Sequence, residues 1–307
     1  MPMSERSAAV GVVVLNWHRP ADTITCLQAL AAITAPAVTV TVLDNGCADF
    51  SAEAVAALVP GAQYRRTATN LGFAGGANAG MRHALAHGAE YVWLVNNDAV
   101  PEPQALAVLL AAAAAAPHVG ILGPKILQAG QPQRIDSVAI DVNLRTGRVY
   151  LTGHDELDRG QYDGLSTVTA VTGCAMLVRR AACERLGGFD ESFFAYLEDA
   201  DLCLRAAAAG YGVAAVPAAR ILHRRAPATG ARQSTSSLYY ATRNHLRLME
   251  RHGKGSGPRR QVRTLTVVAL NLLYALRSEP QMRRERLRAV WRGVTDYRRG
   301  VTGAATF

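Results

Sequence analysis

The chain has 307 residues, of which 50% are hydrophobic and 19% charged, so it can fold around a sizeable core. Its five cysteines are scattered without a CxxC motif, which argues against a disulfide framework or a zinc site and favours a reducing compartment. The apolar run at residues 10–15 is too short for a signal peptide. We therefore expect a cytoplasmic globular protein.

The net charge of +9 is concentrated at the C-terminal end. Residues 1–250 carry 20 Lys and Arg against 21 Asp and Glu, whereas residues 251–307 carry 13 against 3. Such a basic segment can meet an anionic membrane surface, an acidic partner or nucleic acid. A solvated, arginine-rich helix face is the alternative. No nucleic-acid-binding motif accompanies the charge, so we expect no nucleic-acid partner.

Strand and helix patterns alternate through the first hundred residues. Apolar runs rich in valine predict buried strands, and apolar residues at helical spacing predict helices between them. The predicted strands are residues 10–15, 38–43, 64–69 and 91–95, and the predicted helices are residues 22–32, 51–58 and 70–87. This alternation predicts an α/β fold with a doubly wound, mostly parallel sheet flanked by helices.

The second half of the sheet is less regular in sequence. The patterns predict a broken strand at 120–127, a polar hairpin or excursion at 128–167, a buried strand at 168–178 that is interrupted at Gly173 and Cys174, and a buried strand at 212–216. The last of these strands is expected to end at Pro217. Helices are predicted at residues 103–116, 181–186, from 198 to about 210, and at 239–250.

The C-terminal residues form the basic part of the chain. Residues 264–276 are apolar but too few to span a bilayer, and an Arg-rich amphipathic helix is expected beyond Pro280. These helices predict peripheral membrane contact or a homodimer surface. We expect one domain over residues 1–250, with halves of about 1–127 and about 128–250, and a basic helical extension over 251–307.

Two predicted strands end in a carboxylate, at Asp44 and at Asp98. The carboxyl ends of parallel strands share one sheet edge, where open α/β sheets bind ligands. The glycine-rich turn at residues 70–80 would direct helix N–H groups toward that edge, as a phosphate requires. Tight packing of Gly75 and Gly76 on a strand is the alternative. The G-x-G-x-x-G fingerprint is absent, which disfavours a dinucleotide-binding dehydrogenase.

A second acidic cluster begins the helix predicted at residue 198. Glu198 and Asp199 follow the aromatic residues at 193–196, and packing on these rings would raise a carboxyl pKa toward that of a general base. Helix capping is the alternative role for any one of these acids. His223, beyond the last strand, is either a metal ligand or a structural histidine.

These motifs together resemble the family 2 glycosyltransferases of the GT-A fold, in particular the bacterial rhamnosyltransferase-like branch. Each motif is weak alone, but the series runs in order along nearly the whole chain. The matching segments are residues 12–18 (VVVLNWH), 42–46 (VLDNG), 70–78 (NLGFAGGAN), 95–98 (VNND), 171–177 (VTGCAML), 188–191 (GFDE), 196–205 (YLEDADLCLR), 239–240 (YY), 243–244 (RN) and 291–293 (WRG).

The resemblance implies an inverting glycosyltransferase that uses a dTDP- or UDP-linked sugar, with rhamnose as the family-based expectation. Asp199, beside Glu198, would be the base that activates the acceptor hydroxyl. Asp98, with His223, would hold Mg²⁺ or Mn²⁺ against the diphosphate, and Asp44 would bind the pyrimidine base. The full set of residues implied to bind the nucleotide sugar is Asn16, Asp44, Asn70, Gly75, Gly76, Asn78 and Asn97.

One departure from the family pattern is Asn96, which stands where the family carries the first acidic residue of its metal motif. One carboxylate fewer should weaken binding of a divalent cation. The acceptor could be a glycan, a lipid-linked glycan or a small molecule, as in polysaccharide or glycoconjugate biosynthesis. A non-catalytic nucleotide-sugar-binding or scaffold subunit, docked at the inner face of the plasma membrane through the basic tail, is the alternative function.

Overall fold

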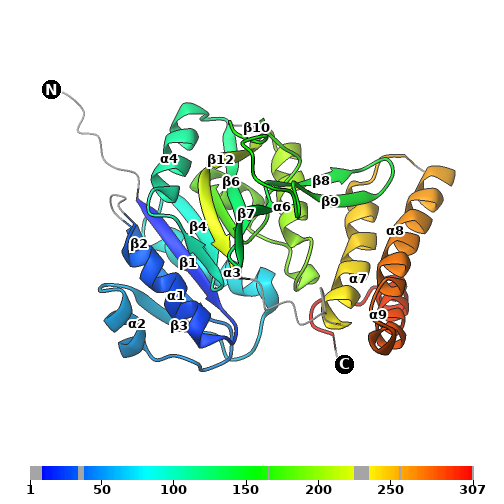
Figure 1. Ribbon diagram of the computed structural model, residues 1–307, viewed down its shortest axis with the longest axis horizontal. Helices are drawn as coiled ribbons and strands as arrows, with labels where there is room; N and C mark the ends of the chain where they lie inside the picture. Colours follow the sequence, from blue (N-terminus) through cyan, green and yellow to red (C-terminus); the bar gives the residue numbers. More distant parts are fainter. Residues whose placement is uncertain (1–8, 34–37, 165, 225–234, 256, 306–307) are drawn as a thin grey trace.

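The computed structural model describes residues 9–33, 38–164, 166–224, 235–255 and 257–305. Within these residues, the centre of the molecule is a ten-stranded, mostly parallel sheet (Figure 1). Its main path has the strand order β10-β12-β6-β11-β4-β1-β2-β3, with β5 paired to β12 and β7 paired to β6. The strands are β1 (Val10–Asn16), β2 (Val38–Asp44), β3 (Gln63–Arg66), β4 (Tyr91–Asn96), β5 (Ala99–Pro101), β6 (Val119–Gln128), β7 (Gln131–Ser137), β10 (Ser166–Thr167), β11 (Ala175–Arg179) and β12 (Gly212–His223).

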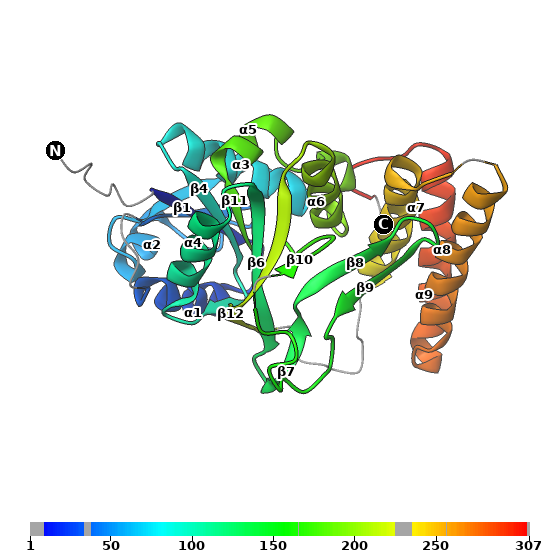
Figure 2. The same cartoon turned by 90° about the horizontal axis from the view of Figure 1, so that it is seen from above.

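Helices cover both faces of this sheet, which explains why its central strands are apolar on both sides (Figure 2). One face packs against α1 (Pro20–Ala31), α2 (Ala52–Leu58) and α4 (Ala105–Ala115) around the fully buried Trp93. The other face packs against α3 (Gly72–Ala86), α5 (Arg180–Leu186) and α6 (Glu198–Ala208). The predicted doubly wound α/β fold is confirmed.

The parallel register brings the ends of β1, β2 and β4 to one edge. Asn16 lies opposite Asp44 in the β1–β2 pair, and Leu15 lies opposite Asn96 in the β1–β4 pair. Asp98 therefore follows β4 at the same edge as Asp44. A short hairpin of β8 (Ala139–Asn143) and β9 (Arg148–Thr152) stands away from the sheet. It lies within residues 128–167, where the sequence predicts a polar hairpin or excursion.

The C-terminal end of the described chain is a group of three packed helices beside the sheet domain, α7 (Thr235–His252), α8 (Pro258–Leu276) and α9 (Pro280–Arg298) (Figure 1). Buried Arg243 and Asn244 attach α7 to the sheet domain, because both donate to the carbonyl of Phe193 at 2.9 Å. The predicted boundary at residue 250 falls at the end of α7. Among the described residues, none of the helices combines the length and the apolar character needed to cross a bilayer.

The last strand of the sheet is longer than predicted. β12 continues past Pro217 to His223, and β6 is unbroken from Val119 to Gln128. The pairing shifts between Val216 and Arg220, opposite Pro124 and Lys125 of β6. Both prolines thus lie at one bulge, where a missing N–H is tolerated. The bulge lets β12 carry His223 to the sheet edge.

The predicted strand at 168–178 is wrong in its first half. β11 begins only at Ala175. Ala170 instead exchanges backbone hydrogen bonds with Ile140 of β8, and the N–H of Gly173 donates to the Asp199 carboxylate at 3.0 Å. The segment before β11 is therefore a support for the site and not a strand of the sheet.

Candidate active site

Asn16 closes β1 with a fully buried side chain. Its Oδ1 accepts from the hydroxyl of Thr23 at 2.6 Å and from the Asn97 amide at 3.4 Å. The Asn97 amide also donates to the carbonyl of His18 at 3.0 Å. These bonds tie the loops after β1 and β4 together, so the structure gives Asn16 and Asn97 a role in shaping the edge of the site.

Asp44 is also fully buried and is surrounded by donors. Its Oδ1 accepts from the N–H of Cys47 at 2.8 Å and of Ala48 at 3.3 Å, and its Oδ2 accepts from the Tyr64 hydroxyl at 2.8 Å. Burial, and then the bond to Asp44, raise the pKa of Tyr64 to about 12, which keeps that hydroxyl a donor. Asp44 thus organises the loop that follows β2.

The two glycines of the glycine-rich turn are tightly packed, and Gly76 packs on strand β1. A Cβ on Gly76 would lie 2.6 Å from Leu15, and one on Gly75 would lie 2.8 Å from the Cβ of Leu71. Two N–H groups in the first turn of α3 are occupied, because Asn70 Oδ1 accepts from Gly72 and the Phe194 carbonyl accepts from Ala74. These groups are not free to bind a phosphate in this conformation.

Asn78 lies on α3 but faces the segment before α6. Its amide donates to the Phe189 carbonyl at 2.9 Å and to Glu191 at 3.0 Å, and its Oδ1 accepts from the N–H of Phe189 at 2.8 Å. With all these contacts the buried side chain fixes the 188–191 segment. The structure does not bring it to the edge where Asp44 and Asp98 lie.

Asp98, His223 and Asp136 form a chain of polar contacts at the sheet edge. Asp98 Oδ1 lies 3.2 Å from His223 Nε2, and Asp136 Oδ2 lies 2.8 Å from His223 Nδ1. Asp98 follows β4, His223 ends β12, and Asp136 belongs to β7. The imidazole is therefore fixed by a carboxylate on one nitrogen and aimed at a second carboxylate with the other.

Neighbouring charges keep Asp98 and His223 ionised. Burial raises the pKa of Asp98, but His223 and the Arg19 guanidinium, 3.2 Å from Oδ2, outweigh it and hold the pKa below its ordinary value. Burial lowers the pKa of His223, but Cys174, Asp136 and Asp98 raise it well above its ordinary value. The proton on Nε2 of His223 thus lies between that nitrogen and Oδ1 of Asp98, the two atoms that a cation would bind in its place.

Asp199 lies at the first turn of α6 and is half-buried. Its Oδ2 accepts from the N–H of Gly173, and its Oδ1 accepts from the N–H of Ala200 at 2.8 Å. Burial raises the pKa of Asp199, and these two N–H groups limit the increase. Glu198 is more deeply buried, and burial together with the charge of Asp199 raises its pKa well above the ordinary value.

A continuous set of contacts joins the two acidic centres. Gly173 donates to Asp199, the next residue Cys174 contacts His223, and the Cys174 carbonyl accepts from the N–H of Asn96 at 2.8 Å. The residues predicted from separate motifs, Asp98, His223 and Asp199, therefore lie around one edge of the sheet. Asn96 holds this edge through its backbone.

Sequence reasoning missed two side chains of this site. Arg19 contacts Asp98 and also Asp22, at 2.6 Å, and Asp136 supports His223. The position of Arg19, between the first strand and the helix behind Pro20, was a usable signal, because basic loop residues at this edge suit an anionic ligand. Asp136 carried no signal, since it belongs to the polar excursion and reaches His223 only in the folded chain.

The curled, mostly parallel sheet with helices on both faces defines the GT-A class of glycosyltransferase folds. The mannosyltransferase PcManGT from Pyrobaculum calidifontis, solved with GDP-Man and Mn²⁺, aligns with a TM-score of 0.57 at 18% identity over 97% of this chain and 84% of that one. TarS residues 1–349 from S. aureus, solved with UDP-GlcNAc, aligns with a TM-score of 0.57 at 17% identity over 95% and 81%.

The sequence comparison identifies the family within this class. The family model described as "Glycosyltransferase like family 2" matches residues 8–250, so the chain belongs to this family and is a glycosyltransferase. A similar protein is the N-acetylglucosaminyl-diphospho-decaprenol L-rhamnosyltransferase of Mycobacterium tuberculosis, 28% identical over 247 residues that make up 74% of this chain and 79% of that protein. The chain is thus rhamnosyltransferase-like, as the motifs predicted.

Proposed function

We propose that this glycosyltransferase moves a sugar from a pyrimidine nucleoside diphosphate donor to an acceptor hydroxyl with inversion at the anomeric carbon. In this proposal the loops held by Asn16, Asp44 and Asn97 receive the nucleoside. Asp98 and His223 hold a divalent cation against the diphosphate, and Asp199 accepts the proton of the acceptor. Asn70 and the glycines of α3 act indirectly, by fixing the backbone around the donor, whereas Asn78 fixes the 188–191 segment.

The observation that supports this proposal most is the chain Asp136–His223–Asp98. Metal-binding histidines usually donate their second ring nitrogen to a carboxylate, which fixes the ring and increases its basicity. Asp136 accepts from Nδ1 in this way, and Nε2 points at a carboxylate oxygen that divalent cations favour as a ligand. The three residues come from distant parts of the chain, and a simple turn between β4 and β5 would not require them to meet.

These residues fit Mg²⁺ or Mn²⁺, which the family resemblance implies. Asp98 and His223 would hold the ion, and its bound form would supply Lewis-acid stabilisation of the departing diphosphate. Arg19 adds a fixed positive charge beside the same carboxylate. With Asn96 in place of an acid, we expect weaker metal binding than a second carboxylate would give.

The base step is assigned to Asp199. An acceptor hydroxyl beside its carboxylate gives up its proton to Asp199 while the hydroxyl oxygen bonds to the anomeric carbon. The bond from that carbon to the diphosphate oxygen breaks at the same time, so one base suffices and no covalent intermediate forms. The N–H of Gly173 holds Asp199 Oδ2 in place, and the acceptor is proposed to bind beside this fixed carboxylate.

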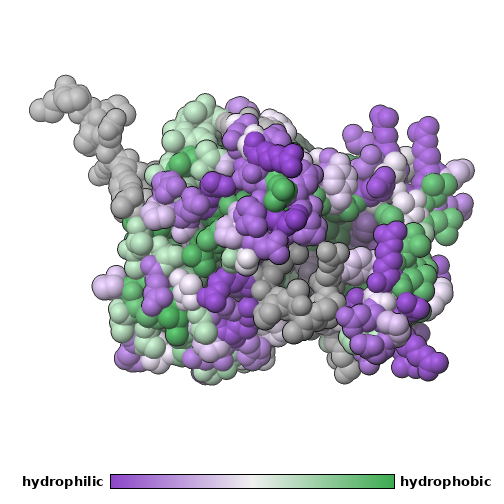
Figure 3. Space-filling view, viewed as in Figure 1, coloured by the Kyte–Doolittle hydropathy of each residue, from purple (hydrophilic) through white to green (hydrophobic). Residues whose placement is uncertain are grey.

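For the substrates we propose a deoxyhexosyl donor such as dTDP-rhamnose and a lipid-linked glycan acceptor. The M. tuberculosis relative, whose name states rhamnosyl transfer to a diphospho-decaprenol glycan, supports this choice. A further support is the outer face of α8, where Val262, Leu265 and Leu273 are between 50% and 67% exposed. Figure 3 displays apolar residues over α8 with hydrophilic residues on either side.

The same helices carry the charge that an anionic bilayer attracts. Apolar residues at 262, 265, 269, 273 and 276 follow one face of α8, and the exposed arginines of this region are Arg251, Arg259, Arg260, Arg277, Arg283, Arg284, Arg288, Arg298 and Arg299. An amphipathic helix with this composition lies in the membrane interface. We therefore propose peripheral membrane contact over a homodimer surface, with α8 bringing the site to lipid-linked acceptors.

A transfer assay tests the proposed reaction. The protein is incubated with dTDP-rhamnose or UDP-sugars, Mn²⁺ and a short-chain lipid-linked N-acetylglucosamine diphosphate, and the product is analysed by mass spectrometry and NMR. The expected product carries one added sugar with the anomeric configuration opposite to that of the donor. Retention of configuration would contradict the single-base reaction assigned to Asp199.

A further inference from the structure

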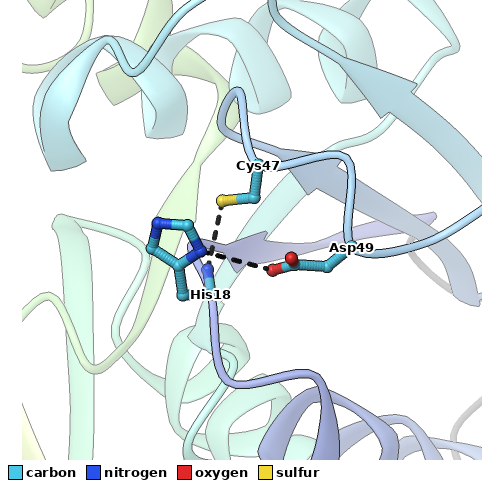
Figure 4. Close-up of side chains that lie close together, drawn as sticks. All are labelled: His18, Cys47 and Asp49. Carbon is cyan, nitrogen blue, oxygen red and sulfur yellow. Dashed lines mark hydrogen bonds and ion pairs between the residues drawn. The ribbon is translucent and has the colours of Figure 1, made fainter.

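A second group of metal-binding side chains shares no residue with the Asp98 centre. His18 follows β1, and Cys47 and Asp49 follow β2 (Figure 4). One ligand atom from each of the three, a ring nitrogen, a sulfur and a carboxylate oxygen, lies within 4.8 Å of the other two. The neighbouring strands β1 and β2 deliver these loops side by side, so residues far apart in sequence meet here.

The backbone of both loops is held in a special conformation. His18 and Ala48 have φ angles of 57° and 62°, in the left-handed region that residues other than glycine adopt infrequently. The N–H of His18 donates to Cys47 Sγ at 3.1 Å, and the N–H of Cys47 donates to Asp44 at 2.8 Å. Such conformations persist where surrounding contacts enforce them, and they concentrate at functional sites.

His18 and Cys47 are accessible to solvent, whereas Oδ2 of Asp49 is buried and has no hydrogen-bond partner among the described residues. The His18 side chain is 61% exposed and that of Asp49 is 19% exposed, with His18 Nδ1 3.9 Å from Asp49 Oδ2. Of the five cysteines, Cys47 is the one that is not buried. A thiol, an imidazole and a carboxylate therefore meet at the surface.

We propose that His18, Cys47 and Asp49 bind a Zn²⁺ ion. Zinc accepts sulfur, nitrogen and oxygen ligands at about 2.0–2.3 Å, so the three ligand atoms need to approach by roughly 1 Å, which the exposed His18 ring and the partly exposed Cys47 allow. Binding replaces the Cys47 S–H bond with a Zn–S bond, and the proton passes to the buffer. Three protein ligands leave one position of the tetrahedron for water or another ligand.

This site differs in chemistry from the Asp98 centre. Asp98 offers a carboxylate that suits Mg²⁺ or Mn²⁺, whereas a cysteine thiolate selects zinc and similar softer cations. Zinc here joins the loops after β1 and β2, and one of these loops is bonded to Asp44. If the proposed nucleotide site is correct, zinc occupancy also fixes the loop beside the base. The zinc site itself does not depend on that function.

Cobalt absorption tests the site directly, because Co²⁺ replaces Zn²⁺ and gives a near-ultraviolet sulfur-to-metal charge-transfer band only when a thiolate is a ligand. The intact chain is titrated with Co²⁺, and the same is done for Cys47→Ser and Cys174→Ser. Cys174 is the matched control, because it lies beside His223 at the other centre. We expect an equimolar band that Zn²⁺ abolishes, that Cys47→Ser lacks and that Cys174→Ser keeps.

A second variant tests the histidine without disturbing the loop. His18→Asn removes the imidazole but tolerates the left-handed backbone, so folding should be preserved, as circular dichroism will check. We expect it to weaken zinc binding at least tenfold in a competition titration with a chromogenic chelator. Absence of the cobalt band, its persistence in Cys47→Ser, its loss in Cys174→Ser, or unchanged affinity in His18→Asn would each overturn the proposal.

Discussion

Asp98 and His223 meet at the edge of the sheet, with Oδ1 of the aspartate 3.2 Å from Nε2 of the histidine. Asp98 follows β4, and His223 reaches it because β12 continues beyond its bulge and pairs with β5. The register places His223 opposite Ala99, the residue after Asp98. The pairing of β12 with β5 thus brings His223, from the second half of the chain, to Asp98, from the first half, and completes the proposed metal site.

The supporting carboxylate of this pair gives the first prediction. Asp136→Asn removes the negative charge at His223 Nδ1, so Mn²⁺ affinity should fall about 10- to 100-fold, as it does when other carboxylates that support a metal-binding histidine are replaced. Isothermal titration with Mn²⁺ measures the effect. Asp141→Asn removes a carboxylate from the neighbouring β8 and serves as the matched control. Equal Mn²⁺ affinity in Asp136→Asn and the wild type would show that Asp136 does not support a metal ligand.

If Asp199 is the base, its replacement should slow the reaction, and the reaction rate should depend on the ionisation of its carboxyl group. Asp199→Asn should lower kcat by about 10²- to 10⁴-fold, the usual range for a general base. Because burial raises the pKa of Asp199, and a base acts only when ionised, kcat/KM should fall as pH drops through a value above 3.8. The Asn variant should lose this acidic limb. A variant that keeps most of its rate would exclude Asp199 as the base.

Because the carboxyl group of Glu198 is buried, we expect the stability of the protein to depend on pH. Burial raises its pKa in the folded state, so the folded chain binds a proton more tightly than the unfolded chain. Stability should therefore be full below the unfolded pKa, near 4.5, and decrease as pH rises toward the folded pKa. Glu198→Gln should remove this decrease and raise Tm at neutral pH but not at pH 4. Urea or thermal unfolding at several pH values measures the stability of the wild type and of Glu198→Gln. If the stability of the two proteins changes with pH in the same way, the prediction is contradicted.

The tight packing of Gly80 in α3 predicts that a larger residue at this position will lower the stability of the fold. A Cβ at Gly80 would lie 2.2 Å from Cγ1 of the buried Val13, which has little freedom to move. Gly80→Ala should destabilise the fold by about 1–3 kcal/mol, as overpacking does, even though alanine favours a helix. Gly130→Ala is the control, because no atom lies within 4 Å of its added Cβ. Equal unfolding midpoints for the two variants would refute this packing role.

The apolar face of α8 predicts binding to anionic vesicles. Leu265→Glu with Leu273→Glu puts charge on that face, so binding should fall at least tenfold in vesicle flotation with phosphatidylglycerol. Leu157→Glu is the control, since Leu157 is a 40% exposed leucine outside the helical group. If α8 instead pairs two copies of the chain, the double variant will change the mass in analytical ultracentrifugation and leave vesicle binding unchanged.

Local patterns in the sequence account for most of the first half of the fold. Valine runs and helical spacing gave β1, β2 and β4 and the helices between them, because these strands are buried on both faces. The ends of β6, β11 and β12 were not predictable in the same way. Pro124 and Pro217 share a bulge that only the pairing of their strands creates, and Gly173 is drawn from β11 by its bond to Asp199.

The candidate site was predictable where a motif lies in one segment and not where side chains meet across the fold. Asp98 follows a predicted strand and Asp199 lies in the first turn of a predicted helix, so their positions followed from the pattern. His223 was expected beyond the last strand and is instead the final residue of β12. Asp136 reaches His223 only through the return of β7, and Asn78 turns toward Phe189 instead of the donor edge. Cys47 and His18 come from different loops, so cysteine spacing alone gives no indication of the zinc site that we propose.

The central claim is that Asp98 and His223 hold a divalent cation that binds the diphosphate. The most direct measurement is isothermal titration of the intact chain with dTDP and with UDP, in the presence and absence of Mn²⁺, for the wild type and Asp98→Asn. We expect Mn²⁺ to tighten nucleotide binding at least tenfold in the wild type and to have no effect in Asp98→Asn. Nucleotide affinity in the wild type that is the same with and without Mn²⁺ would contradict the claim.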